Sequence, residues 1–165
     1  MIVGDVFSKP IADASHKIAA ALLAGNTIFS CGEKSGALVA QLFNDYLAYG
    51  FELDRPGFVA LNLNKLSDSN STENHFAQSL QVHGNSADVL VVVSAGGNSQ
   101  ALIGAIETAI DKNMTVLLLS AATDDLLSAT VGYNDVLIST AEFSGQLTTQ
   151  AQFQIVQCIC VLVDH

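Results

Sequence analysis

The sequence predicts a doubly wound α/β domain in which a five-stranded parallel sheet lies between two layers of helices. Uninterrupted apolar runs, of which Val89–Val93 is the clearest, are typical of strands buried on both faces. Segments with apolar residues three and four apart, typical of helices, alternate with these runs. Small polar turns separate the two kinds of segment, as in successive βα units. We therefore expect one domain over residues 1–165, with an irregular N-terminus over residues 1–8.

Each element is predicted from its apolar pattern and from the residues that end it. Proline suits the first turn of a helix, and glycine or asparagine suits the end. In the first half of the chain the predicted elements are a helix from Pro10 to Gly25, a strand over residues 27–31, a helix from Gly36 to Gly50, a strand over residues 58–63 and a loop over residues 66–73. In the second half they are a short helix over residues 76–82, a strand over residues 89–93, a helix over residues 102–112, a strand over residues 115–119, a loop with one helical turn over residues 120–130, a strand over residues 135–138 and a helix from Gly145 onward. The last helix has a broad apolar face, so we expect it to be buried against the sheet or against another subunit.

The composition limits the classes of partner. The chain has 165 residues, 50% of them hydrophobic and 13% charged, with a formal net charge of −10. This charge argues against nonspecific binding to nucleic acids or to anionic membranes. The three cysteines do not suggest a disulfide framework, the N-terminus has no signal-peptide pattern, and no apolar run reaches the roughly 18 residues of a membrane span. We expect a cytoplasmic protein that does not bind membranes.

The strongest functional signal is the turn Ser94–Ser99, here called the second turn. It opens the helix that follows the strand over residues 89–93, where free backbone N–H groups and the helix dipole favour an anion. Gly96 and Gly97 allow a ligand to approach the backbone. The side-chain donors are Ser94, Asn98 and Ser99. One interpretation is a phosphate cradle, and the other is a βα turn capped by Asn or Ser without a ligand.

An earlier turn, Gly32–Gly36, also follows a predicted buried strand and is here called the first turn. Ligands of parallel sheets bind at the carboxyl ends of the strands, near the point where the strand order reverses. If the strands that precede the two turns are neighbours, the turns face one crevice. Lys34 in the first turn would attract a phosphate, whereas Glu33 would repel it.

The segment Ser94-Ala95-Gly96-Gly97-Asn98-Ser99, after a valine-rich strand, resembles the Ser-Thr-x-Gly-Asn-Ser signature of sugar isomerase (SIS) domains. The segments Ser30-Cys31-Gly32 and Asp54-Arg55-Pro56-Gly57 look like the phosphoheptose isomerase branch of that family. The closing residues 157–164 look more like its non-catalytic sister, the initiator-associating protein that binds the replication initiator DnaA. The resemblance extends from about Ile11 to Asp164.

This resemblance implies a flavodoxin-like SIS fold, a homodimer or homotetramer, and a phosphosugar site completed between subunits. The residues that it implies as phosphosugar ligands are Ser94, Gly96, Gly97, Asn98, Ser99, Gly32, Lys34 and Ser35. The first turn departs from the family pattern, because Glu33 and Lys34 stand within it and its serine is displaced to Ser35. The second turn has lost hydroxyl groups at Ala95 and Gly96.

The positions that carry catalysis in the isomerases are changed. Aldose–ketose isomerisation needs a base that moves a proton between adjacent carbons and an acid near the carbonyl. The family uses a Glu and a His, and the matching positions hold Tyr46 and Cys158, while an assisting Gln is retained at Gln150. Tyrosine, with a reference pKa of about 10, is a poor base near neutral pH. The other His, Cys and acidic residues do not suggest a metal site, so no metal or cofactor is expected.

Three functions follow from these residues. The first, which we favour, is a sugar-phosphate-binding module that lacks the usual catalytic pair. The second is a phosphosugar isomerase acting on sedoheptulose 7-phosphate, with catalytic groups from Asp45 or from the loop over residues 67–75. The third is a protein-interaction module like the DnaA-associating relatives. The acidic pair Asp124 and Asp125 is expected to be solvated or to cap a helix.

Overall fold

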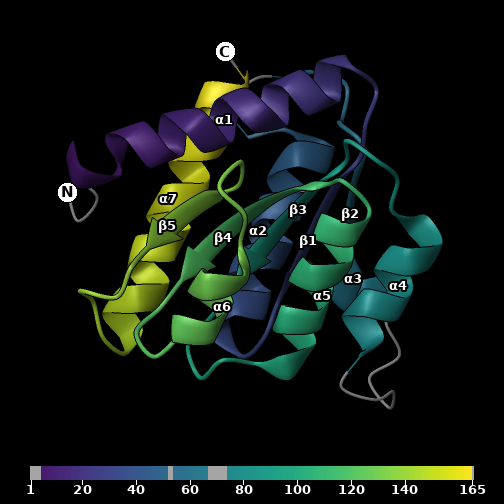
Figure 1. The fold of residues 1–165 in the computed structure, drawn as a ribbon. Helices are drawn as coiled ribbons and strands as arrows, with labels where there is room; N and C mark the ends of the chain where they lie inside the picture. The colour runs from purple at the N-terminus through teal and green to yellow at the C-terminus, as the bar shows by residue number, and fades with distance from the viewer. Residues whose placement is uncertain (1–4, 52–53, 67–73, 165) are drawn as a thin grey trace.

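The computed structural model describes residues 5–51, 54–66 and 74–164, which form three layers (Figure 1). The central layer is a sheet of five parallel strands in the order β2-β1-β3-β4-β5. The strands are β1 (Ile28–Gly32), β2 (Ala60–Asn62), β3 (Val89–Val93), β4 (Thr115–Ser120) and β5 (Val136–Ser139). The order reverses between β1 and β3, because the chain continues outward to β2 on one side and to β4 and β5 on the other. The predicted doubly wound fold is confirmed.

Helices cover both faces of this sheet. The helices are α1 (Ser8–Leu23), α2 (Ser35–Tyr49), α3 (Leu63–Leu66), α4 (His75–His83), α5 (Gln100–Asp111), α6 (Asp125–Thr130) and α7 (Gln146–Asp164). α1, α2 and α7 pack on one face, and α3, α4, α5 and α6 pack on the other. None of the helices within the described ranges is long and apolar enough to cross a membrane.

Strand β3 contributes to the hydrophobic core on both faces. Val91 and Val93 pack with α1, α2 and α7, whereas Leu90 and Val92 pack with the helices of the opposite face. Successive side chains of a strand point to opposite faces, so a strand covered on both sides needs an uninterrupted apolar sequence. This is the physical reason that residues 89–93 could be recognised as a central strand.

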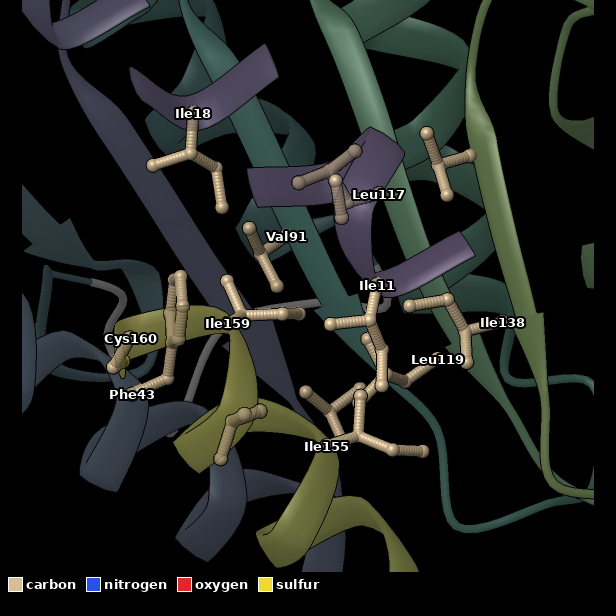
Figure 2. Packing of buried hydrophobic residues seen from close by; sticks show 14 of the residues in the cluster. Ile11, Ile18, Phe43, Val91, Leu117, Leu119, Ile138, Ile155, Ile159 and Cys160 are labelled. Carbon is tan, nitrogen blue, oxygen red and sulfur yellow. The ribbon is translucent and has the colours of Figure 1, made fainter. Parts of the chain in front are cut away.

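Helix α7 is buried against the sheet and against α1 and α2, as one of the two interpretations of its broad apolar face predicted. Figure 2 shows Ile155 and Ile159 of α7 directed toward side chains of α1 and of the sheet. In the same view Cys160 lies beside Phe43 of α2. The side chains from the sheet that are labelled in this cluster are Val91, Leu117, Leu119 and Ile138.

Two regions differ from the predicted elements. Strand β2 ends at Asn62, whose Oδ1 accepts a hydrogen bond from the backbone N of Asn64 at 2.8 Å, and helix α3 follows at once where the end of a strand and a loop were predicted. At the N-terminus, Asp5–Phe7 form a 3₁₀ helix and Ser8 begins α1, where irregular chain was expected. Phe7 explains why this segment is structured, because the residue is 4% exposed and packs in the core. The predicted loop over residues 67–73 lies outside the described residues.

Candidate functional site

The first and second turns lie side by side at the carboxyl edge of the sheet. β1 and β3 are neighbours, and Gly32 is in register with Val93 at the ends of the two strands. The condition that the sequence set for a shared crevice is therefore met. The first turn lies so close to the end of β3 that larger residues do not fit, since a Cβ on Gly32 would lie 2.8 Å from the carbonyl oxygen of Val93. A Cβ on Gly36 would overlap with the same oxygen, so both positions need glycine.

A cavity of about 190 Å³ lies at this edge, bounded by both turns, the loop after β4 and the start of α7. Its lining residues are Ser35, Ala95, Ala121, Ala122, Thr123, Phe143, Ser144, Gly145, Thr148 and Thr149. Five of these carry hydroxyl groups and none carries a charge. Hydroxyl groups donate and accept hydrogen bonds, so the lining suits a ligand that is itself rich in hydroxyls.

The second turn has a backbone that requires glycine. The φ angle is +105° at Gly96 and +96° at Gly97, both in the left-handed region. The hydroxyl oxygen of Ser94 accepts a hydrogen bond from the N–H of Gly96 at 3.1 Å. The hydroxyl oxygen of Ser99 accepts one from the N–H of Leu102 at 3.4 Å and thereby caps α5. These two hydroxyl oxygens thus act as acceptors inside the turn, while their O–H groups can still donate.

The donors of the second turn are partly used. The N–H of Gly97 donates to Thr123 Oγ1 at 3.1 Å, across to the loop after β4. The side-chain Oδ1 of Asn98 accepts from the N–H of Leu126 at 2.9 Å, which leaves its Nδ2, the expected donor to a phosphate, still able to donate. The N–H of Ala95 makes no hydrogen bond within the described part of the chain, and Ala95 lines the cavity. That N–H is therefore one of the donors that the turn leaves for a ligand, and Ala95 is the residue of the second turn that lines the cavity.

The first turn contributes through Ser35. The backbone of Gly32 is already paired, because its N–H donates to Asn64 Oδ1 at 3.1 Å and its carbonyl accepts from Asn64 Nδ2 at 2.8 Å. Lys34 is exposed and has a φ of 55° and a ψ of −130°. Of the eight residues implied as phosphosugar ligands, all of them within the described ranges, Ser35 is the one whose atoms line the cavity.

Several lining residues were not found from the sequence. Thr123 comes from the loop after β4, and Ser144, Thr148 and Thr149 come from the start of α7 and the segment before it. Single hydroxyl residues in such segments carry no recognisable pattern. Asp124 was expected to be solvated or to cap a helix. It is buried, with 3% of the residue exposed, and although it occupies the N-cap position of α6 its side chain makes no capping hydrogen bond there.

The positions that hold catalytic groups in the isomerases lie away from the cavity in the same chain. Tyr46 is about 16 Å along α2 from Ser35, and Cys158 is about 14 Å along α7 from Thr149, at 1.5 Å per residue. The hydroxyl oxygen of Tyr46 accepts a hydrogen bond from Gln157 Nε2 at 3.4 Å. Gln150 is exposed and does not line the cavity.

The buried thiols are poor nucleophiles. Cys31 is fully buried, and burial raises the pKa of its thiol far above the usual range. Burial raises the pKa of Cys160 from 9.0 to about 12. A thiol must ionise to attack or to bind a metal strongly. Within the described ranges, no three His, Cys, Asp or Glu side chains come together as metal ligands.

Comparisons with known proteins agree with the geometry of the fold. A family model described as SIS domain matches residues 5–121. A phosphoheptose isomerase of Methylibium petroleiphilum is 31% identical, over 97% of this chain and 84% of the relative. A DnaA initiator-associating protein DiaA of Photorhabdus laumondii is 29% identical, over 94% of this chain and 83% of the relative. The structure of a phosphoheptose isomerase from Francisella tularensis superposes with a TM-score of 0.86 at 25% identity, over 95% of this chain and 86% of that chain.

Proposed function

This chain belongs to the SIS domain family, and on that premise we propose that it is a cytoplasmic sugar-phosphate-binding protein without the isomerase's proton-transfer pair. The observation that carries this proposal is the cavity between the two turns. It lies at the reversal of the strand order, where parallel sheets bind their ligands, and its lining offers hydroxyl groups and the unused N–H of Ala95. The residues proposed as ligands are Ser35 and Ala95 from the two turns, with Thr123, Ser144, Thr148 and Thr149.

The further residues of the turns have supporting roles in this proposal. Ser94 and Ser99 hold the second turn in shape through their hydroxyl oxygens, and Gly96 and Gly97 supply its backbone conformation. Lys34 precedes Ser35 in the sequence and gives the first turn an exposed positive charge, whose long-range attraction favours an anionic ligand.

The chemistry of the lining supports the proposed absence of isomerase activity. Moving a proton between adjacent carbons needs a group that changes its protonation state near neutral pH. The cavity is lined by aliphatic, aromatic and hydroxyl side chains, none of which titrates in that range. Tyr46 and Cys158, at the family's catalytic positions, are distant from the cavity within one chain.

The test measures binding and turnover together. Isothermal titration calorimetry should detect binding of sedoheptulose 7-phosphate to the wild type. Thr149→Val should weaken this binding about tenfold, because the variant loses one hydroxyl contact while the side chain keeps its shape. Thr115→Val is the matched control, because Thr115 begins β4 at the opposite edge of the sheet. Equal effects of the two variants, or the absence of binding by the wild type, would contradict the proposal.

An isomerase assay on the same compound distinguishes the second function. We expect turnover at background level, with the phosphoheptose isomerase of Methylibium petroleiphilum as the positive control. Turnover well above background that Tyr46→Phe leaves intact would favour an active isomerase that uses other groups. One candidate base is Asp45, whose Oδ1 now accepts a hydrogen bond from Gln41 Nε2 at 2.7 Å.

The resemblance to DiaA favours a protein-interaction role as the third function, with the replication initiator DnaA as the partner to test. Pull-down with purified DnaA decides whether that role applies here.

We also propose that the protein is a homodimer or homotetramer, so that Tyr46 and Cys158 of one subunit can approach the cavity of another. Light scattering at micromolar concentration tests this, and a monomer would contradict a site shared between subunits.

A further inference from the structure

Asp124 is a buried carboxylate beside the second turn. It lies in the loop between β4 and α6, and the residue is 3% exposed. Its Oδ2 accepts a hydrogen bond from the N–H of Ala121 at 2.8 Å, and its Oδ1 accepts one from the N–H of Asn98 at 3.3 Å. A carboxylate of the protein is therefore bound by the backbone N–H groups that stand beside the cavity.

Asn98, and not Asp124, caps helix α6 through its side chain. Asp124 occupies the N-cap position of α6, yet its side chain makes no capping hydrogen bond there. Instead Asn98 Oδ1 accepts from the N–H of Leu126 at 2.9 Å and from that of Leu127 at 3.4 Å. Because Asn98 caps α6, the carboxylate of Asp124 is free to bind the backbone of Asn98. The second turn and the loop after β4 are thereby held together by contacts in both directions.

This arrangement changes the electrostatics of the cavity. A phosphate bound against Ala95 and Thr123 would lie beside this negative charge, because Thr123 and Asp124 are adjacent and the carboxylate accepts from the N–H of Ala121, which also lines the cavity. The lining contains no Lys, Arg or His that would offset that charge. Like charges repel, and solvent screens this repulsion less when one of the charges is buried.

We propose that Asp124 sets the charge selectivity of this cavity: its buried carboxylate, held beside the lining by the N–H groups of Asn98 and Ala121, lowers the affinity for a phosphate dianion relative to a neutral polyol. The inference rests on the proposed function, which makes the cavity the sugar-phosphate site. It deepens that function, because recognition then depends mainly on the hydroxyl groups of the sugar, and the phosphate adds little to the affinity.

The test compares sedoheptulose 7-phosphate with sedoheptulose by calorimetry. The wild type should prefer the phosphate ester by less than about tenfold. Asp124→Asn and Asp124→Ser should raise that preference at least tenfold, since both remove the charge and Ser retains one acceptor. Asp88→Asn is the matched control: Asp88 is 2% exposed and accepts from the N–H groups of Thr27 at 2.9 Å and Asn85 at 2.8 Å, at the amino edge of the sheet. Its preference should equal that of the wild type.

Each outcome decides the inference. An unchanged or lower preference in both Asp124 variants overturns it while leaving the proposed function intact, provided that the wild type binds both compounds. A preference of a hundredfold or more for the phosphate ester in the wild type also overturns it. That measurement does not depend on whether a variant folds. If the wild type binds neither compound, the proposed function fails, and the inference stands only if an Asp124 variant gains binding of the phosphate ester. Failure of every protein to bind the ester overturns both.

Discussion

Gln152 of α7 donates a hydrogen bond through Nε2 to the backbone carbonyl of Ser94 at 2.8 Å, across 58 residues of sequence. Both residues are buried, with 0% and 1% of their surface exposed. Thr148 and Thr149, one helical turn earlier on α7, line the cavity. This hydrogen bond therefore fixes the α7 wall of the cavity against the second turn.

Replacing Gln152 with Leu should destabilise the fold by about 1–3 kcal/mol, because the buried carbonyl of Ser94 loses its donor. Urea denaturation measures the change. Gln157→Leu on the same helix is the control, since Gln157 is only half-buried and its bond to the Tyr46 hydroxyl is 3.4 Å long. A loss no larger than that of the control would contradict the role assigned to Gln152.

The pair Arg55–Asp164 should be among the costliest contacts to break. Arg55 Nε lies 2.8 Å from Asp164 Oδ1, with the side chains 13% and 0% exposed. The guanidinium also donates to the carbonyl of Tyr46 at 3.2 Å near the end of α2 and lies 3.9 Å from the ring centre of Phe58. Arg55→Met removes a cation from a buried carboxylate and should cost about 3–5 kcal/mol in a denaturation experiment.

The exposed pair Lys9–Asp13 provides the contrast for this experiment. Its side chains are 86% and 44% exposed, and the neighbouring Lys9 holds the pKa of Asp13 below its usual value. Solvent screens such a pair, so Lys9→Met should leave the denaturation midpoint unchanged. A similar loss of stability in Arg55→Met and Lys9→Met would show that burial does not determine how strongly the Arg55–Asp164 pair stabilises the fold.

The three thiols should differ in reactivity. Cys31 and Cys160 are buried with raised pKa values, whereas Cys158 is half-buried. With Ellman's reagent at pH 8, the native wild type should show at most one reactive thiol, and native Cys158→Ser should show none before guanidinium is added. Rapid reaction of a second thiol in the native protein would contradict the observed burial.

The buried thiols also predict how stability depends on alkaline pH. The pKa of Cys160 rises from 9.0 to about 12 on folding, so as the pH rises the unfolded chain releases this proton first. The stabilisation is complete below pH 9 and is lost as the pH rises toward 12. The free energy of unfolding, measured by denaturation across this range, should fall less steeply in Cys160→Ala. An equal slope in both proteins would argue against ionisation of this thiol in the unfolded chain.

Lys34 stands in a backbone conformation that suits glycine, with a φ of 55° and a ψ of −130°. Lys34→Gly should therefore stabilise the fold by about 1 kcal/mol, because the relief of strain exceeds the extra entropy of glycine. Asn113→Gly is the control, since Asn113 has a φ of 60° and asparagine tolerates this region at little cost. A loss of stability in Lys34→Gly would show that its side chain contributes more than its backbone costs.

The sequence by itself determined the layers of this protein and the order of its elements. The apolar run of β3 and the helical periods are local patterns, and each follows from how one element must be covered by its neighbours. The sequence also predicted that the two turns share one edge of the sheet if their strands are neighbours. The structure shows that β1 and β3 are neighbours.

Only the tertiary structure decided which side chains meet in the cavity. Asn98 and Ser94 belong to the expected signature, yet their partners are the N–H of Leu126 and the amide of Gln152, in segments that the turn meets only after folding. The burial of Asp124 was decided in the same way. Hydrogen bonds between distant segments leave no periodic pattern in the sequence, so the lining of a site assembled from several loops cannot be deduced from any one of them.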